Sequence, residues 1–398
     1  MRILHLNAGN ETGGGMHHIL GLLNEFNSGK NPGLQESQYE MSQEFLPGST
    51  KETPISSPDE FTLGVLEKGE LLQRAQNAGI RTVHFPNRMK MSIPLMQKMK
   101  NHIKNEQIDI IHTHGPRANV YANLLKKMTP FTWVATVHSD PFHDFMGKGK
   151  YGNLLTRINV HALKNADRII AISETFRNGL INAGFQGNRI VTALNGIDFH
   201  QGLSQTAAKK DYGFAEDDFV IIMVARLEPV KGHEVALKAF SEIAAKHPEC
   251  KLVLVGEGSL LTRLKLLVND LNISNHVHFM GHQQHVDPFY QIADLTMLTS
   301  YSESFPLVLL ESARAKTPVI ATDVGGVSQL IQGRQHGWKV APGNTRELCL
   351  AMEEALYAHR KGKLQVIGDK LFTHASRKFS VQTFAEDIYN VYLKMNVD

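Results

Sequence analysis

The strongest chemical signal in this 398-residue chain is a segment in which two glutamates frame an apolar stretch, SESFPLVLLESA, residues 302–313. Pro306 suits the start of a helix, so free backbone N–H groups around Phe305–Val308 can donate to a diphosphate. A carboxylate accepts two hydrogen bonds at once, which makes Glu303 and Glu311 suitable partners for vicinal hydroxyls. The segment therefore predicts a site for an elongated ligand that carries both phosphate and hydroxyl groups.

Two cations stand five residues apart in VARLEPVKG, residues 224–232, just after an expected strand. Arg226 offers a planar fork to phosphate oxygens, and Lys231 offers a mobile point charge. Together they could clamp a pyrophosphate and stabilise the charge that grows as a nucleotide leaves. Two surface cations on a loop are commonplace, so this interpretation depends on the glutamate segment.

Small residues follow several expected strands. Gly13–Gly15 lie between the first expected strand and the first helix, where they let a substrate approach the backbone. Gly256 and Gly281 end two later strands and leave room for a flat base. Ordinary tight turns explain each of these positions about as well. The G-x-G-x-x-G spacing of a dinucleotide fingerprint is absent, which disfavours a nicotinamide oxidoreductase.

Histidines end two consecutive strands expected in the first half of the chain, His112 with His114, and then His138. A neutral imidazole at His138 could accept a hydrogen bond from a sugar hydroxyl or orient an acceptor, and His114 is the second candidate for such contact. No carboxylate lies at convincing spacing for a metal, and no Asp-x-Asp motif occurs. We therefore expect no metal and no other cofactor, so Arg226, Lys231 and helix amides must neutralise the diphosphate.

The elements that would position these residues alternate along almost the whole chain. Short apolar runs such as Ile3–Asn7 and Val220–Ala225 are separated by helical patterns such as Met16–Phe26 and Glu234–Lys246. This alternation predicts an α/β fold with parallel sheets covered by helices on both faces. Loops at the carboxyl ends of the strands are then expected to form any binding site.

The length favours two domains, and a polar stretch at about residues 198–215 separates two sets of βα units. We expect an acceptor-side domain over residues 1–198 and a donor domain over residues 199–379. A final helix within 380–398 is expected to pack back on the first domain. The cleft beside the linker is the expected site.

Composition narrows the class of protein. Hydrophobic residues make up 42% and charged residues 20%, which supplies apolar material for two globular cores. The net charge is only +3 without a long basic run, which disfavours nucleic acid as a partner. Cys250 and Cys349 are typical of reduced, buried residues. The N-terminus is too short and polar for a signal peptide, so a cytoplasmic location is expected, with possible peripheral contact at the inner face of the membrane.

Two segments depart from the alternating pattern. Residues 28–60 are rich in Ser, Pro, Gly, Gln and Glu, and we expect either disorder or a mobile lid there. Residues 88–104 combine five Lys or Arg with Met, Ile and Leu and contain no acid. This composition suits contact with an anionic membrane. A solvated helix with ordinary core contacts is the alternative.

In its motifs and their order, along nearly the full length, the chain resembles the family-4 glycosyltransferases of the GT-B fold, also called glycosyl transferases group 1. The residues that carry the resemblance are Gly13-Gly14-Gly15, Asn195-Gly196-Ile197-Asp198, Arg226 with Lys231, Val255-Gly256-Glu257-Gly258, and Glu303 to Glu311. The resemblance implies two Rossmann-like domains whose parallel sheets face each other across a cleft. It also implies that Glu311 binds the ribose and Glu303 the transferred sugar.

The resemblance further implies that Arg226 and Lys231 hold the diphosphate, and that His138 contacts the sugar or the acceptor. The expected donor-binding residues are Gly14, Gly15, Arg226, Lys231, Gly256, Gly281, Glu303, Ser304, Phe305, Pro306, Leu307, Val308 and Glu311. The expected catalytic residues are His138, Arg226, Lys231 and Glu303. Family members retain the anomeric configuration by front-face attack, in which the leaving phosphate helps to deprotonate the acceptor and no protein nucleophile is needed.

These observations predict a retaining, metal-independent glycosyltransferase that uses a UDP-sugar, with a GDP-sugar as the main alternative. The expected acceptor is a lipid-linked or cell-surface glycan precursor in bacteria. A non-catalytic sugar-nucleotide-binding protein is one alternative function. A GT-B relative such as an epimerase or a phosphorylase is another.

Overall fold

The computed structural model describes residues 1–9, 11, 13–28, 59–86, 92–142, 145, 149–200 and 207–395. The chain divides into two compact units. The first unit comprises Met1–Asn195 together with Val381–Asp398, and the second comprises Gly196–Ser380. Most of the 28–60 segment, part of the 88–104 segment and part of the expected linker lie outside the described residues.

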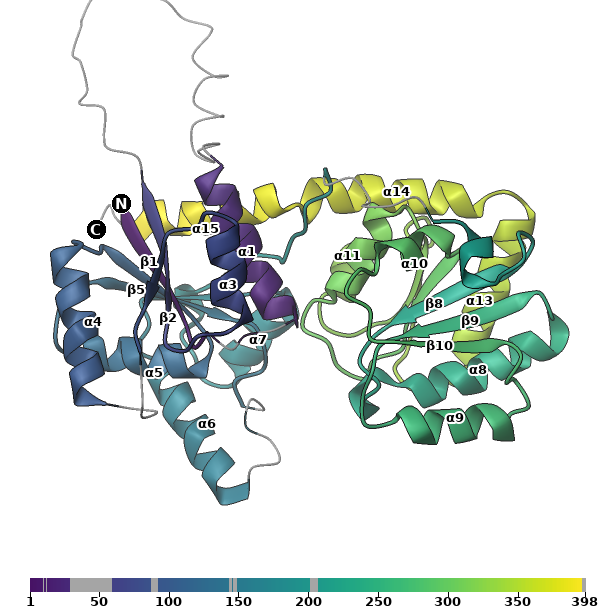
Figure 1. Cartoon of the computed structure of the whole chain (residues 1–398), viewed down its shortest axis with the longest axis horizontal. Coiled ribbons are helices and arrows are strands. Elements are labelled where there is room, and N and C mark those ends of the chain that lie inside the picture. Colours follow the sequence, from purple (N-terminus) through teal and green to yellow (C-terminus); the bar gives the residue numbers. More distant parts are fainter. Residues whose placement is uncertain are drawn as a thin grey trace, which may run out of the picture. The chain divides into compact units, whose positions relative to one another are not determined.

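Within the described residues, the first unit is built on a parallel sheet of seven strands in the order β3-β2-β1-β4-β5-β6-β7 (Figure 1). Its strands are β1 (Arg2–Asn7), β2 (Glu60–Val65), β3 (Thr82–His84), β4 (Ile110–His114), β5 (Thr132–Val137), β6 (Arg168–Ala171) and β7 (Ile190–Thr192). Its helices are α1 (Gly13–Asn27), α3 (Glu70–Asn77), α4 (Ile93–Asn105), α5 (Pro116–Leu125), α6 (Gly149–Leu163), α7 (Glu174–Asn182) and α15 (Val381–Met395).

Helices cover both faces of this sheet, and its strands bury side chains on both sides. Helices α1, α3 and α15 pack on one face, where Ile3 and Phe384 belong to one apolar cluster. Helices α4, α5, α6 and α7 pack on the other face, where Leu4 and Trp133 belong to a second cluster. Side chains alternate along a strand, so His5, which follows Leu4, lies on the face covered by α1 and α15.

The second unit has a parallel sheet of six strands among its described residues, in the order β10-β9-β8-β11-β12-β13. Its strands are β8 (Phe219–Val224), β9 (Cys250–Val255), β10 (Val277–Gly281), β11 (Leu295–Leu298), β12 (Val319–Thr322) and β13 (Trp338–Val340). Its helices are α8 (His233–Lys246), α9 (Leu261–Asp270), α10 (Asp287–Ile292), α11 (Leu307–Arg314), α12 (Val327–Leu330), α13 (Thr345–Arg360) and α14 (Leu364–Lys378). The expected α/β class with two parallel sheets is confirmed.

One local expectation is wrong. The glycines at 13–15 do not form a loop before the first helix, because α1 begins at Gly13, three residues before the expected start at Met16. The first backbone N–H groups of a helix have no intrahelical partner. Glycine has no side chain, so the backbone N–H groups of this first turn stay accessible. Glycine disfavours a helix mainly in the helix interior.

The described part of the 88–104 segment forms α4. Ser92 caps this helix by accepting a hydrogen bond from the backbone N–H of Leu95 at 3.2 Å. Leu95, Met99 and Ile103 are buried, whereas Ile93 is 84% exposed. Among the described residues, no helix combines the length and apolar character needed to cross a bilayer.

Candidate functional site

The second unit joins the two segments that carry the strongest sequence signals. Lys231 ends the short 3-10 helix η3 (Pro229–Lys231), and its Nζ lies 2.5 Å from Oε1 of Glu303. Ser300, just after β11, donates its hydroxyl to the same carboxylate oxygen at 2.6 Å. Both charged side chains are largely buried, with 18% of Lys231 and 11% of Glu303 exposed. A lysine has three N–H donors, so this ammonium can hold Glu303 and still donate to a phosphate.

Gly232 fixes the backbone beside this ion pair. Its φ is +69°, and a Cβ at this position would lie 2.1 Å from the carbonyl oxygen of Thr299. The hydroxyl of Thr299 in turn donates to the carbonyls of Lys231 and Gly232 at 3.0 and 3.1 Å. The turn that carries Lys231 is therefore pressed against the end of β11, next to Ser300.

Arg226 lies on the turn after β8, and its side chain is exposed. The neighbouring Gly256 has a φ of +141°, and a Cβ there would lie 2.1 Å from the carbonyl oxygen of Ala225. The N–H of Gly256 donates to the carbonyl of Gly281 at 2.8 Å, so the ends of β8, β9 and β10 meet. The hydrogen bonds and ion pairs of the described residues join Lys231 to Glu303, but they do not join Arg226 to either.

The backbone from Glu303 to Phe305 is held by a second glycine turn. A Cβ at Gly325, whose φ is +56°, would lie 2.2 Å from the carbonyl oxygen of Glu303. The N–H of Gly326 donates to the carbonyl of Ser304 at 3.0 Å. The ring of Phe305 is buried, with its centroid 5.1 Å from that of Phe379. This packing fixes the approach to the amino end of α11.

Helix α11 begins directly after Pro306, which has no N–H to offer. The first helix-type hydrogen bond runs from the N–H of Leu309 to the carbonyl of Pro306 at 3.1 Å. The N–H groups of Leu307 and Val308 precede that bond and stand at the positive end of the helix dipole. They are the amides that this segment can present to an anion.

Glu311 is held by a hydroxyl rather than by a cation. Tyr290, at the end of α10, donates its hydroxyl to Oε2 of Glu311 at 3.0 Å. Burial raises the pKa of Glu311, while the Tyr290 hydrogen bond and the nearby charge of Arg314 oppose that rise. Arg314 itself pairs with Asp287 at 2.6 Å. These three supporting residues could not be predicted from the sequence, because no motif marks them.

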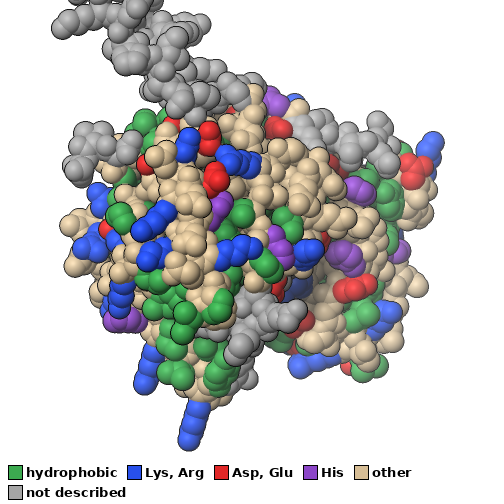
Figure 2. All heavy atoms as spheres, turned by 60° about the vertical axis from the view of Figure 1, so that its left-hand side comes forward, with side chains coloured by type: hydrophobic (Ala, Val, Ile, Leu, Met, Phe, Trp, Pro, Cys, Tyr) green, Lys and Arg blue, Asp and Glu red, His purple; other side chains and the backbone are tan. Residues whose placement is uncertain are grey.

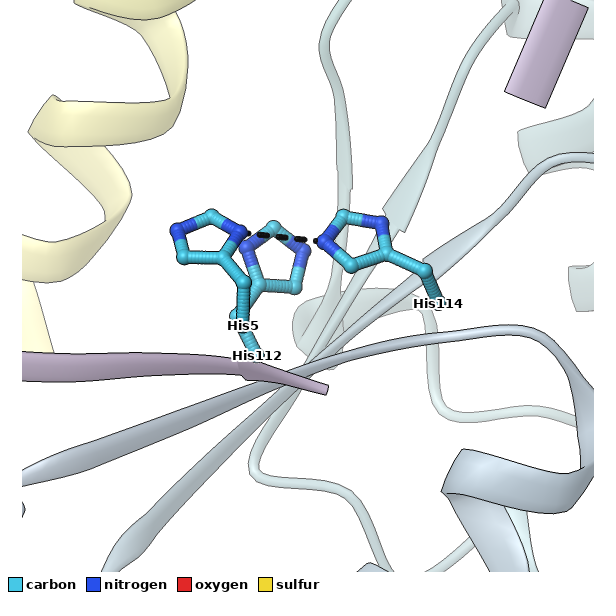
Figure 3. A group of neighbouring side chains, drawn as sticks. All are labelled: His5, His112 and His114. Carbon is cyan, nitrogen blue, oxygen red and sulfur yellow. Dashed lines mark hydrogen bonds between the residues drawn. The ribbon is translucent and has the colours of Figure 1, made fainter. Parts of the chain in front are cut away.

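The first unit gathers the strand-end histidines, together with others that the sequence analysis did not single out. Nδ1 of His114 lies 3.1 Å from Nε2 of His138, and Nε2 of His114 lies 3.1 Å from Nδ1 of His5. Figure 3 draws His5, His112 and His114. His18, on α1, places Nδ1 2.7 Å from Oδ1 of Asn195. Burial holds the pKa of His114 and of His138 well below the usual range, so both rings are neutral at neutral pH.

Gly14 and Gly15 occupy the first turn of α1, and Gly14 is exposed. A Cβ at Gly15 would lie 2.4 Å from Oε1 of Glu11. Oε2 of the same carboxylate accepts a hydrogen bond from the side chain of Asn7 at 3.4 Å. The glycines therefore place an open helix start beside the end of β1.

Comparisons with known proteins agree on one class. A family model described as Glycosyl transferases group 1 matches residues 204–363, and one described as Glycosyltransferase Family 4 matches residues 59–201. The N-acetyl-alpha-D-glucosaminyl L-malate synthase of Bacillus anthracis is 31% identical over 64% of this chain and 66% of its own length. The putative glycosyltransferase EpsD of Bacillus subtilis is 26% identical over 77% of this chain and 82% of its own length.

Solved structures share the fold. HepE of Anabaena in complex with UDP has a TM-score of 0.79 and 20% identity, covering 99% of this chain and 100% of its own. The lipopolysaccharide outer core galactosyltransferase WaaB, in its apo form, has a TM-score of 0.69 and 18% identity, with coverage of 99% and 100%. These similarities extend over both units of the chain.

The raised pKa of Glu311 generates a prediction about stability. A carboxyl group whose pKa is higher in the folded state than in the unfolded state reduces stability when ionised, and this cost disappears as the pH falls through the folded pKa. Glu311→Gln removes the charge and keeps an oxygen that can accept the Tyr290 hydroxyl. We expect the variant to unfold at a higher urea concentration than the wild type at about pH 7, with a smaller difference at about pH 4.

Glu228→Gln is the matched control, and we expect it to change the stability in the opposite direction. Hydrogen bonds from the side chain and the backbone N–H of Ser259 lower the pKa of Glu228. Its ionised form therefore stabilises the fold above the unfolded pKa, and that contribution is lost as the pH falls. The measurement is the urea concentration at the midpoint of unfolding, compared for both variants at about pH 7 and about pH 4. A lower midpoint for Glu311→Gln at about pH 7 would contradict the burial cost.

Proposed function

Because this chain belongs to the family-4 glycosyltransferases of the GT-B fold, we propose that it transfers a sugar from a nucleotide-sugar donor to an acceptor with retention of the anomeric configuration. The observation that carries the proposal is the contact of Lys231 with Glu303 beside the amino end of α11. The contact brings a cation to a carboxylate that shortly precedes, in the chain, the open amides at the start of α11. A diphosphate linked to a sugar requires these three kinds of partner.

The proposed donor is a UDP-sugar. The solved structures of HepE hold UDP, UDP with glucose, and UDP-glucose. Glu311 is the proposed ribose ligand, because a carboxylate can accept hydrogen bonds from two vicinal hydroxyls. The Tyr290 hydroxyl already occupies one lone pair of Oε2 and leaves the other oxygen available. A GDP-sugar remains the alternative donor.

The proposed transfer needs no protein nucleophile. The acceptor hydroxyl oxygen bonds to the anomeric carbon on the face from which the phosphate oxygen departs, and the acceptor proton passes to the leaving phosphate. Negative charge grows on the diphosphate, where Lys231 and Arg226 stabilise it. Glu303 keeps Lys231 in place through Oε1 and offers its other oxygen to a hydroxyl of the transferred sugar.

In the first unit, His138 is the proposed contact for the sugar or the acceptor, with His114 behind it. Their neutral rings can each donate one hydrogen bond and accept one. The bond between His138 and His114 therefore commits one nitrogen of His138 and leaves Nδ1 for a hydroxyl. Gly14 and Gly15 are proposed to admit the diphosphate to the start of α1. The proposed acceptor is a lipid-linked or cell-surface glycan precursor in bacteria.

An assay with UDP-sugars and GDP-sugars, with and without glycan acceptors and in excess chelator, tests the activity. We expect release of the nucleoside diphosphate by mass spectrometry and a product with the donor's anomeric configuration by NMR. Turnover that requires an added divalent ion would overturn the metal-independent scheme. An epimerised donor without acceptor would point to an epimerase. Calorimetric binding without any product would point to a non-catalytic sugar-nucleotide-binding protein.

Removing either cation should slow the chemical step. We expect Lys231→Ala and Arg226→Ala each to lower kcat by about 10²–10³, the loss typical when a group that stabilises developing charge is removed. Lys238→Ala is the control, because Lys238 is an exposed lysine on α8 of the same unit. Steady-state kinetics with saturating donor provide the measurement. A loss below about threefold would remove that residue from this role.

Peripheral contact with anionic membrane through α4 is also proposed. Lys98 and Lys104 are exposed on the helix that exposes Ile93. The face of the molecule drawn in Figure 2 carries Lys and Arg side chains next to hydrophobic ones. We expect the wild type to co-sediment with phosphatidylglycerol vesicles. Most of a Lys98→Glu, Lys104→Glu double variant should remain in the supernatant. Equal sedimentation of the two proteins would show that these charges do not bind membrane.

A further inference from the structure

Buried polar side chains of the first unit, together with the half-buried His138, form one continuous line of hydrogen bonds. Five contacts of 3.1, 3.1, 3.3, 2.5 and 2.7 Å join, in this order, His138, His114, His5, Tyr392, His112 and Thr136. The strand register explains the gathering, since His5 pairs with His112 in β1 and β4, and His114 pairs with Thr136 of β5. All of these side chains lie on the face of the sheet that α1 and α15 cover.

A neutral imidazole has one N–H and one lone pair, so the directly bonded rings of His138, His114 and His5 must point their donors the same way along the line. Both nitrogens of His5 are used, one by His114 and the other by Tyr392. Both nitrogens of His112 are used as well, by Tyr392 and Thr136. The His5, His112 and His114 group drawn in Figure 3 is therefore a satisfied core network and offers no uncommitted lone pair at its inner two rings.

His18 differs from these rings. Its Nδ1 faces the carbonyl oxygen of the Asn195 side chain, which can only accept, so Nδ1 carries the hydrogen and Nε2 carries the lone pair. Nε2 is buried, and it has no hydrogen-bond partner among the described residues. The ring is only 5% exposed and stands perpendicular to that of His138, with their centroids 4.3 Å apart. A buried acceptor without a donor reduces the stability of the fold. A ligand bound to Nε2 would remove this cost.

We propose that His18, His114 and His138 form a three-histidine site for a borderline transition-metal ion such as Zn²⁺ or Co²⁺. One ring nitrogen of each lies within 4.8 Å of the other two. Tetrahedral Zn²⁺ with bonds of about 2.0–2.1 Å to nitrogen places its ligand atoms about 3.4 Å apart. The nitrogens of His114 and His138 are already 3.1 Å apart.

The surrounding hydrogen bonds suit such an ion. Metal-bound histidines usually donate their second N–H to a carbonyl or another acceptor, which fixes the ring and its tautomer. Asn195 accepts from His18, and His5 can accept from Nε2 of His114, which leaves Nδ1 of His114 as a lone pair. Burial lowers the pKa of His18 to about 4, so its lone pair is available at neutral pH. Imidazole ligands select Zn²⁺ or Co²⁺ over Mg²⁺ and Ca²⁺.

The ion has a functional consequence that rests on the proposed role of His138. The metal takes Nε2 of His138 and replaces the hydrogen bond to His114. The ring can then no longer adjust to a sugar or acceptor hydroxyl, so Zn²⁺ inhibits transfer. Water or an anion completes the fourth position, because the cluster itself contains no carboxylate among the described residues.

Binding is tested without any substrate. Tag-free protein, freed of metal by chelator and gel filtration, is titrated with Co²⁺ and followed by the visible bands of tetrahedral cobalt, with Zn²⁺ as the displacing ion. We expect one ion per chain. His18→Gln should weaken binding by more than about 100-fold, beyond the effect of losing a partner that only orients a ligand. His17→Gln, an exposed neighbour on the same helix, should bind as the wild type does.

Asn195→Asp gives a second, opposite readout. A carboxylate beside Nδ1 makes His18 a more basic ligand, and we expect about tenfold tighter binding. A misfolded variant cannot produce that gain. Absence of tetrahedral cobalt bands in the wild type, or unchanged affinity in His18→Gln, would overturn the metal site. No step of the titration requires activity. The result on metal binding therefore stands whether or not the chain catalyses the proposed transfer.

Discussion

The close approach of neighbouring turns at the carboxyl ends of parallel strands is the constraint on which the rest of the structure depends. In the second unit, Gly256 lies against the carbonyl of Ala225, and Gly232 lies against that of Thr299, each with no room for a Cβ. A side chain at either position would force the turns apart. Gly232 directly follows Lys231, so its approach to Thr299 places the turn that carries Lys231 beside Ser300, whose hydroxyl donates to Glu303.

The candidate site residues of the two units satisfy their polar groups in different ways. The second unit pairs opposite charges, as in Lys231 with Glu303, and tolerates one carboxylate, Glu311, whose burial raises its pKa. The first unit uses neutral imidazoles, whose pKa burial lowers, and joins them by hydrogen bonds. A charged pair can hold a phosphate by electrostatics. A neutral ring can accept or donate according to what approaches it, which suits contact with hydroxyls.

The fold class could be predicted from the sequence, because apolar runs and helical periods alternate along the chain and imply parallel sheets. The residues on either side of the Lys231–Glu303 contact could also be predicted, since each ends or follows a strand. Their direct bond could not, because it depends on which turns become neighbours. His5 was missed for a similar reason. It lies within β1 rather than at its end, and only the register with β4 places it beside His112. Tyr392 approaches from 280 residues away in sequence.

The line of imidazoles also links its outer end to helix α15. A hydroxyl that donates to Nδ1 of His138 leaves Nε2–H to donate to His114. His114 must then donate to His5, and His5 to the Tyr392 hydroxyl. A metal on Nδ1 of His114 requires the same direction from that ring inward. In that direction Tyr392, on α15, donates its hydroxyl to His112 rather than to His5. Whatever occupies His138 or His114 in these ways therefore selects the tautomer of His5 and turns the hydrogen of the Tyr392 hydroxyl away from that ring.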